Sequence, residues 1–319
     1  MKRKIYIACF CLIIIIGFLG FTKAQESPLL HFIHITDIHL NSSKSKDAER
    51  LLGSSEKLLK DAVNQINEIK DLDFVLATGD LVDIPEEELV DKFIEITMSL
   101  KYPLYVTTGN HDISVGGGLG KQGFIKKFNA AKDSTSFTAG MPYYSFSPNE
   151  QFTFICFDGT TDTVVTAHGQ IQDSKQFEWL KSELEKNKDK YVIIAGHFPL
   201  IEPYKSKSHN FLEPDRSKFL DLINSYKNVL GVFTGHYHAA RLIKSKNKIH
   251  NSGPAVIQWP NAFREVFITK DKKNLVFDFK WHPVNGEELR NKSKENSDSW
   301  GLTQGASEDR IQTVKLKIY

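Results

Sequence analysis

Five short clusters of polar residues carry the side chains of this sequence that are best suited to chemistry. They are rich in aspartate, asparagine and histidine, which bind metal ions and transfer protons. In chain order they are Asp37-Ile38-His39, Gly79-Asp80, Gly109-Asn110-His111-Asp112, Gly196-His197 and Gly235-His236-Tyr237-His238. No cysteine belongs to the set, and imidazole predominates. The set therefore indicates divalent ions of intermediate hardness, Mn, Fe or Zn, because a structural zinc site uses thiolates and calcium prefers oxygen ligands.

The candidate ligands are too numerous for one tetrahedral ion. Two ions that share Asp80 would satisfy the set. A pair of ions about 3.5 to 4 Å apart is the arrangement with which two-metal hydrolases hold the attacking and leaving oxygens of an in-line displacement. The sequence thus predicts a dinuclear hydrolase whose nucleophile is a hydroxide held between the ions.

Each cluster follows a short apolar run that predicts a buried strand. The runs are residues 30–35, 74–77, 104–106, 191–195 and 229–233. Buried strands of this kind are typical of a parallel or mixed sheet covered on both faces. Ligand-binding groups gather outside the carboxyl ends of such strands, so we expect the clusters to meet at one sheet edge. Four clusters begin with glycine, which lets the chain leave its strand at an angle forbidden to other residues.

The ordered set D-x-H, G-D, G-N-H-D, G-H and G-H-x-H resembles the calcineurin-like metallophosphoesterases over residues 30–268. Within that superfamily it is most similar to the bacterial cyclic-nucleotide phosphodiesterase branch. The resemblance implies an α/β fold, a four-layer α/β/β/α sandwich with two mixed sheets. It also implies a role for each cluster: Asp37, His39 and His238 would hold one ion, Asn110, His197 and His236 the other, and Asp80 would bridge them.

By the same resemblance His111 would be the catalytic histidine. Imidazole titrates near neutral pH, so it would protonate the leaving alkoxide or stabilise the transition state as a cation. A carboxylate usually orients such a histidine, and the candidates are Asp112 and Asp83. We favour Asp83, because adjacent residues at a strand end tend to point apart. The related Ser/Thr phosphatases also place the partner at this offset, in G-D-x-V-D.

Differences between this sequence and the motifs of related phosphatases disfavour some of the possible activities. The Ser/Thr phosphatases have Arg-Gly where this chain has Ile84-Pro85, and glutamate where it has Asp112, so a protein phosphatase is disfavoured. Purple acid phosphatases differ at His39 and Asp83. The prediction is a phosphodiesterase, with a broad phosphomonoesterase as the alternative. A lipid-directed phosphodiesterase or pyrophosphatase at the membrane is a further alternative, and a non-catalytic scaffold is disfavoured because no candidate ligand has been lost.

Composition and the amino-terminal sequence indicate the class of protein, its localisation and its domain divisions. With 319 residues, 40% hydrophobic residues and a net charge of +2, the chain is an ordinary globular protein with no charge signal for nucleic acid. A basic start, an apolar stretch over residues 5–21 and small residues near Ala24 predict a signal peptide and export to the periplasm or medium. An uncleaved membrane anchor is the alternative. The expected divisions are residues 1–24, a catalytic domain over 25–270, and a strand-rich extension over 271–319 that completes the second sheet.

The sequence between the clusters predicts further elements. Apolar stripes at helical spacing indicate helices within residues 52–69 and 177–184. Further strands are expected at residues 143–146, 152–157, 266–268, 275–281 and 313–318. Residues 285–310 are expected to form a long exposed loop. Residues 205–210, with His209, and the glycine-rich residues 116–120 are candidate rims of the site, and His250 is expected at the surface.

Overall fold

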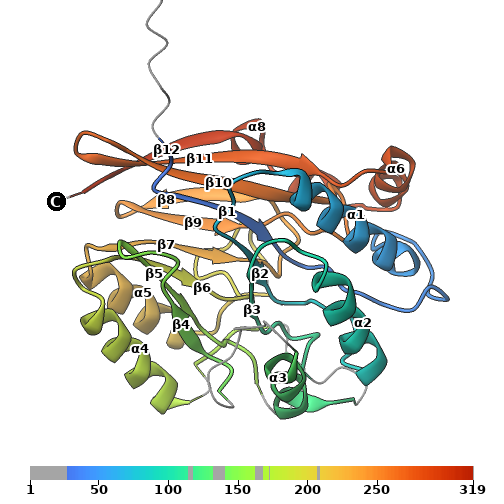
Figure 1. Cartoon of the computed structure of the whole chain (residues 1–319), viewed down its shortest axis with the longest axis horizontal. Helices are drawn as coiled ribbons and strands as arrows, with labels where there is room; N and C mark the ends of the chain where they lie inside the picture. Colours follow the sequence, from blue (N-terminus) through green and yellow to red (C-terminus); the bar gives the residue numbers. More distant parts are fainter. Residues whose placement is uncertain are drawn as a thin grey trace, which may run out of the picture.

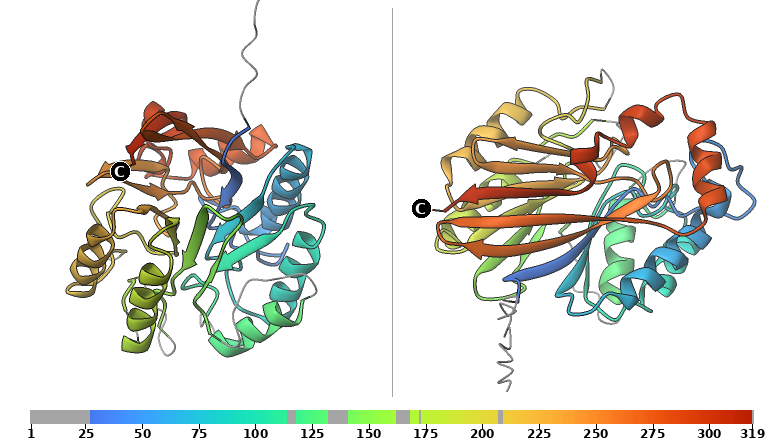
Figure 2. Two further views of the ribbon diagram at one scale, coloured as in Figure 1. Left: turned by 60° about the vertical axis from the view of Figure 1, so that its left-hand side comes forward. Right: turned by 90° about the horizontal axis from the view of Figure 1, so that it is seen from above.

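The computed structural model describes residues 27–113, 118–131, 141–161, 168–171, 173–206 and 209–318. Two six-stranded sheets lie face to face, with strand orders β12-β11-β10-β1-β2-β3 and β4-β5-β6-β7-β9-β8. Helices α1 to α3 pack on the outer side of the first sheet beside β1 to β3, and α4 and α5 pack on the outer side of the second (Figure 1). Figure 2 shows the same layers from two other sides. The four-layer α/β/β/α sandwich predicted from the sequence is confirmed.

The first sheet joins a parallel half to an antiparallel half. Its strands are β1 (Leu30–Ile35), β2 (Phe74–Thr78), β3 (Leu104–Thr107), β10 (Ala262–Asp271), β11 (Asn274–Pro283) and β12 (Gln312–Lys317). The second sheet contains β4 (Tyr144–Phe146), β5 (Phe152–Cys156), β6 (Tyr191–Ala195), β7 (Val229–Thr234), β8 (Arg241–Ser245) and β9 (Lys248–Ser252). The main helices are α1 (Ser55–Glu68), α2 (Glu87–Thr97), α3 (Gly120–Ala130), α4 (Ser174–Lys186) and α5 (Asp215–Ser225).

Aromatic side chains fill the space between the sheets. The Phe154 ring of the second sheet lies 5.4 Å from the Phe32 ring and 5.0 Å from the Phe74 ring of the first sheet, both edge to face. Each buried phenylalanine contributes roughly 1.5 to 3 kcal/mol. The strands that carry the polar clusters are therefore anchored by a rigid core.

The five strands that precede the clusters belong to two sheets, so the expectation of a single sheet edge was wrong. β1, β2 and β3 lie in the first sheet, whereas β6 and β7 lie in the second. Because an apolar run indicates burial without indicating its sheet, the sequence pattern alone could not separate them. The site forms where the carboxyl ends of both sets meet.

The C-terminal strands also differ from expectation. β10, β11 and β12 complete the sheet that contains β1, while β8 and β9 complete the second sheet. β8 and β9 were missed because they carry lysine, arginine and asparagine rather than an apolar run. His250 of β9 is buried and not at the surface. The proposed division of the chain at residue 270 stays a prediction.

Residues 285–310 form helices and not the long exposed loop that was expected. They contain α6 (Glu287–Glu295), α7 (Trp300–Thr303) and α8 (Ser307–Arg310). Glutamate, leucine, arginine and lysine in α6 favour a helix, and Gly286 precedes it with a φ of 95°. Low hydrophobicity concealed these helices, since they bury polar residues such as Ser293.

One buried ion pair in the first sheet predicts a response to acid. Glu265 accepts hydrogen bonds from His31 Nε2 at 2.8 Å and His282 Nε2 at 2.7 Å. Burial opposes its ionisation, but the bonds from His282 and His31 lower the pKa of Glu265 to about 2. A lowered native pKa stabilises the fold above the unfolded pKa, and this stability is lost as the pH falls toward 2.

We therefore expect the difference in unfolding free energy between the natural chain and Glu265→Gln to shrink by roughly 2 kcal/mol between pH 5 and pH 2. Denaturant unfolding at several pH values measures this difference. Glu68→Gln on the exposed face of α1 is the control. An identical acid response in all three proteins would contradict the assignment.

Candidate metal centre

The polar clusters converge on one site, and its ligand atoms fall into two groups. Asp37, His39, Asp80 and His238 form the first group. Asp80, His197 and His236 form the second, and the ligand atoms of each group lie within 4.8 Å of one another. Asp80 is the residue common to both, which is the arrangement that two neighbouring ions require.

The closest atoms in the site are acceptors that face one another. His39 Nε2 lies 3.1 Å from His238 Nε2 and 3.4 Å from Asp80 Oδ2. On the other side of Asp80, its Oδ2 lies 3.2 Å from His197 Nε2, which is 3.2 Å from His236 Nδ1. Such close approaches between buried nitrogen and oxygen atoms fit a shared cation.

Hydrogen bonds to the second ring nitrogen fix which nitrogen each histidine presents. The Nδ1 atoms of three histidines face acceptors: His39 faces Asp83 Oδ1 at 3.0 Å, His197 faces the Thr78 carbonyl at 2.8 Å, and His238 faces Gln258 Oε1 at 2.6 Å. Each Nδ1 therefore carries the hydrogen, and each Nε2 presents its lone pair to the centre. Acceptors on the outer nitrogen are typical of metal-binding histidines.

Asn110 provides an independent test of whether the site fits metal ions. Its Oδ1 is buried and has no hydrogen-bond partner in the described part of the chain, although it lies in the same pocket as Asp80 and His236. A buried amide oxygen without a donor is costly. A divalent cation would satisfy it, so the donor set fits the group that the sequence implies.

The carboxylates of the site are electrostatically unbalanced without a cation. Burial, reinforced by Asp80 and opposed by His197, raises the pKa of Asp37 to about 7. Burial also opposes ionisation of Asp80, yet the neighbouring histidines, His197 foremost, hold its pKa well below the usual range. Two carboxylates buried side by side thus compete for the same positive charge, which bound ions would supply.

The backbone is strained at most of the candidate ligands. A positive φ is uncommon outside glycine and costs roughly 1 to 3 kcal/mol. It occurs at Asp37 (51°), His39 (45°), Asp80 (50°), His236 (71°) and His238 (51°). Strain of this kind clusters at functional sites, where the surrounding structure holds it in place. Here the Asp37 carboxylate accepts from His236 N at 3.0 and 3.1 Å.

The glycines act mainly through close packing, which differs from the expected role of turning the chain. Only Gly79 among the cluster glycines has a positive φ, at 81°. A Cβ on Gly109 would lie 2.2 Å from Asp80 Oδ1, and one on Gly235 would lie 2.6 Å from Asp37 Oδ2. Gly196 is less confined, because a Cβ there would meet only the Phe157 carbonyl at 3.1 Å.

Gly109→Ala is therefore expected to displace the Asp80 carboxylate and lower metal affinity by about 10- to 100-fold, as loss of supporting contacts does in metal sites. Metal titration of the stripped protein measures the change. Gly301→Ala on α7 is the matched control, because a Cβ there meets nothing within 4 Å. Equal affinity in the two variants would show that Asp80 tolerates the added methyl group.

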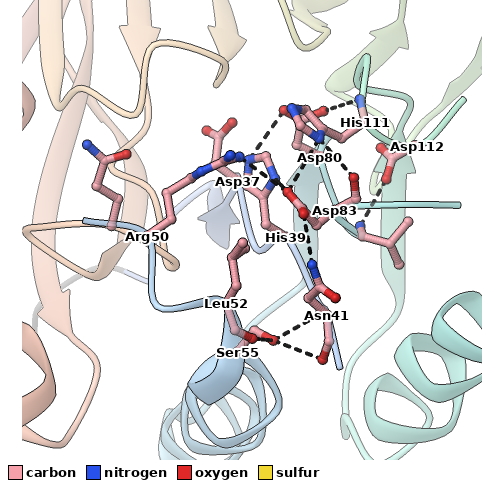
Figure 3. Close-up of polar contacts among 12 residues, drawn as sticks. Asp37, His39, Asn41, Arg50, Leu52, Ser55, Asp80, Asp83, His111 and Asp112 are labelled. Atoms are coloured by element: carbon pink, nitrogen blue, oxygen red, sulfur yellow. Dashed lines mark hydrogen bonds and ion pairs between the residues drawn. The ribbon is translucent and has the colours of Figure 1, made fainter. Parts of the chain in front are cut away.

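His111 lies beside the two groups and contacts Asp83. Its Nδ1 is 2.9 Å from the Asp83 carbonyl oxygen and 3.4 Å from Asp83 Oδ1. Asp112 instead accepts hydrogen bonds from the backbone nitrogens of Leu81, Val82 and Gly109, and so links the loop that follows β2 to the loop that follows β3. The Asp83 carboxylate also contacts His39 at 3.0 Å, so Asp83 orients a candidate ligand as well as His111. Figure 3 shows Asp83 beside His39 and His111.

A pocket of about 400 Å³ opens over the site. Besides the cluster residues, its walls include Glu49, Arg50, Tyr204, His209, Gln258 and Ser299. Sequence reasoning missed Arg50, Gln258 and Ser299, because they lie outside the motifs and no spacing links them to the site. His209 does line the pocket, with its ring 5.4 Å from the His236 ring. The other described rim residues, 118–120, 205, 206 and 210, do not line this pocket, and residues 116–117 and 207–208 lie outside the described part of the chain.

Comparisons with known proteins agree with this geometry. The family model for calcineurin-like phosphoesterases matches residues 30–240. The chain is 26% identical over 227 residues to a 3',5'-cyclic adenosine monophosphate phosphodiesterase, CpdA, of Haemophilus influenzae, covering 68% of this chain and 73% of that protein. It is 26% identical over 215 residues to a probable glycerophosphodiester phosphodiesterase, GpdQ, of Arcobacter nitrofigilis, covering 65% and 71%.

The fold also matches solved structures. A dimetal phosphatase from Danio rerio superposes with a TM-score of 0.65 at 16% sequence identity, over 92% of this chain and 100% of that one. At this identity the likeness concerns the fold.

Proposed function

The chain belongs to the calcineurin-like phosphoesterase family and is a metal-dependent phosphoester hydrolase, and from that premise we propose that it acts on phosphodiesters. The observation that carries the proposal is the pair of ligand groups that share Asp80, with His111 at their edge. Relatives with the names cyclic-nucleotide phosphodiesterase and glycerophosphodiester phosphodiesterase support a diester substrate.

We assign each candidate ligand to one of two metal positions, following the two groups and adding Asn110 to the second. Asp37, His39 and His238 would hold one ion, Asn110, His197 and His236 the other, and Asp80 would bridge them. Two divalent ions, Mn, Fe or Zn, would supply Lewis-acid stabilisation of the phosphoryl group and an activated water at neutral pH.

The proton for the leaving oxygen would come from His111. Its Nδ1 is held by the Asp83 carbonyl at 2.9 Å, which leaves Nε2 as the nitrogen that can serve the pocket. The His111 backbone nitrogen donates to Asp80 Oδ1 at 2.9 Å, so the imidazole is tied to the residue that both ligand groups share. A general acid placed in this way typically contributes about 10²- to 10⁴-fold to the rate.

A substrate panel tests the proposal. The protein is stripped with chelator, reloaded with Mn, Fe or Zn in turn, and assayed on bis-p-nitrophenyl phosphate, cyclic nucleotides, glycerophosphodiesters and the matching monoesters. We expect at least one diester to be hydrolysed faster than its monoester. Faster turnover of the monoesters would favour a phosphomonoesterase, and a fully loaded protein without turnover on any ester would favour a scaffold.

We also propose that residues 1–24 direct export. These residues lie outside the described part of the chain, and the proposal rests on their basic and apolar pattern. Within the described residues, no helix is long and apolar enough to cross a membrane. The mass of the protein recovered from cells tests the proposal: cleavage after residue 24 supports a signal peptide, and an intact amino terminus in the membrane fraction supports an anchor.

A further inference from the structure

Arg50 reaches the metal centre from a segment that belongs to none of the motifs. It lies between the first cluster and α1, and its side chain lines the pocket beside His39 and His238. Figure 3 shows the side chain extended toward the cluster. Nη1 donates to Asp83 Oδ1 at 3.2 Å, and 38% of the side chain is exposed. The guanidinium forms no other hydrogen bond to the described residues.

The backbone that carries Arg50 is held firmly in place. Arg50 pairs with Gln258 in an isolated antiparallel bridge, and Leu51 N donates to the Ile257 carbonyl at 2.9 Å. The neighbouring Glu49 accepts a hydrogen bond from Gln258 Nε2 at 2.6 Å, and its carbonyl accepts one from Ser293 Oγ of α6. The C-terminal helices thus fix one wall of the pocket, and Arg50 is presented by rigid structure.

The charges of the site indicate that Arg50 binds an anionic ligand. Three carboxylates, those of Asp37, Asp80 and Asp83, lie at the centre. Two divalent ions would bring four positive charges, which these three carboxylates and the hydroxide expected between the ions balance, so the partly exposed guanidinium leaves one positive charge over. A phosphodiester anion that contacts both the ions and Arg50 would neutralise that charge, and planar N–H groups suit the oxygens of a phosphoryl group.

We propose that Arg50 is a substrate-binding residue that donates hydrogen bonds to a non-bridging oxygen of the phosphoryl group. The proposal rests on the proposed function, because it takes the reacting phosphorus to lie over the metal centre. Asp83 then has a further role, because its carboxylate contacts Arg50, His39 and His111. It therefore aligns the anion-binding arginine with the proton donor.

The test is the affinity of the manganese-loaded full chain for inorganic phosphate, measured by calorimetry together with metal content. Arg50→Ala is expected to weaken phosphate binding by about 10- to 100-fold, the range for loss of a charged hydrogen bond, with metal content unchanged. Arg50→Lys keeps the charge but loses the planar donor pair, so an intermediate affinity is expected. Arg216→Ala is the matched control, since Arg216 lies on α5 and pairs with Glu213.

Two outcomes would overturn the inference. Unchanged phosphate affinity in Arg50→Ala would show that the guanidinium does not contact the anion. Loss of metal in parallel with loss of phosphate binding, in both Arg50 variants, would show that Arg50 acts only by holding Asp83 against His39. Phosphate binding needs no turnover, so a protein that binds phosphate through Arg50 yet hydrolyses no diester would uphold the phosphoryl-binding role of Arg50 and refute the proposed diester substrate.

Discussion

Replacement of Asp80 by alanine is expected to empty both metal positions at once. Asp80 Oδ2 lies 3.4 Å from His39 Nε2 and 3.2 Å from His197 Nε2, one histidine from each ligand group. Removing its carboxylate takes a ligand from each position and one negative charge from the pair, while the other ligands remain buried and face one another. We expect bound manganese to fall from about two ions per chain to near none, and turnover to fall by more than about 100-fold.

Elemental analysis after reloading and dialysis measures the metal content. Asp221→Ala is the matched control, because Asp221 is exposed on α5. Asn110→Ala separates the positions further: it removes a ligand from the second group alone and should cost one ion. Retention of one tightly held ion in Asp80→Ala would mean that Asp80 serves a single position and that the assignment of a shared ligand is wrong.

Convergence of the clusters was predictable because it depends on local features. A short apolar strand followed by a polar turn places its side chains at the carboxyl end of a sheet, and each cluster has that form. The order of the clusters indicated the family. The fold implied by that family then indicated that the protein has a second sheet. The pairing of β7 with β9, and of β10 with β1, could not be obtained locally, since these contacts depend on packing across the whole chain.

The residues that support the site were harder to foresee. Gln258 holds Nδ1 of His238 and bonds to Glu49, yet neither belongs to a motif or an apolar pattern. They meet because the segment before β10 runs beside distant parts of the chain, where Thr36 pairs with Ala255 and Arg50 pairs with Gln258 in isolated bridges. A side chain whose role is set by such long-range register carries no signal in its own sequence neighbourhood. Sequence therefore identified the side chains that converge on the site, and structure was needed for the wall of the pocket.

His111→Ala is expected to keep both ions and lose turnover by about 10²- to 10⁴-fold, the usual contribution of a positioned general acid. Neither ligand group depends on His111 for a ligand atom, since His111 meets only His39 and Asp83 in a separate cluster. His111→Asn is the sharper variant, because its amide can still donate to the Asp83 carbonyl as Nδ1 does, but it has no proton to give to a leaving group. Loss of activity in both variants at full metal content would separate proton donation from positioning.

The choice of leaving group decides between the two roles considered for His111. A p-nitrophenolate leaves without a proton, whereas an alkoxide of ribose or glycerol needs one. If His111 protonates the leaving oxygen, the loss in His111→Asn should be at least about tenfold greater for an alkyl diester than for bis-p-nitrophenyl phosphate. An equal loss on both esters would assign His111 to stabilising charge on the phosphoryl oxygens. Normal turnover in either variant would mean that the proton comes from another group, of which His209, lining the same pocket, is the first to examine.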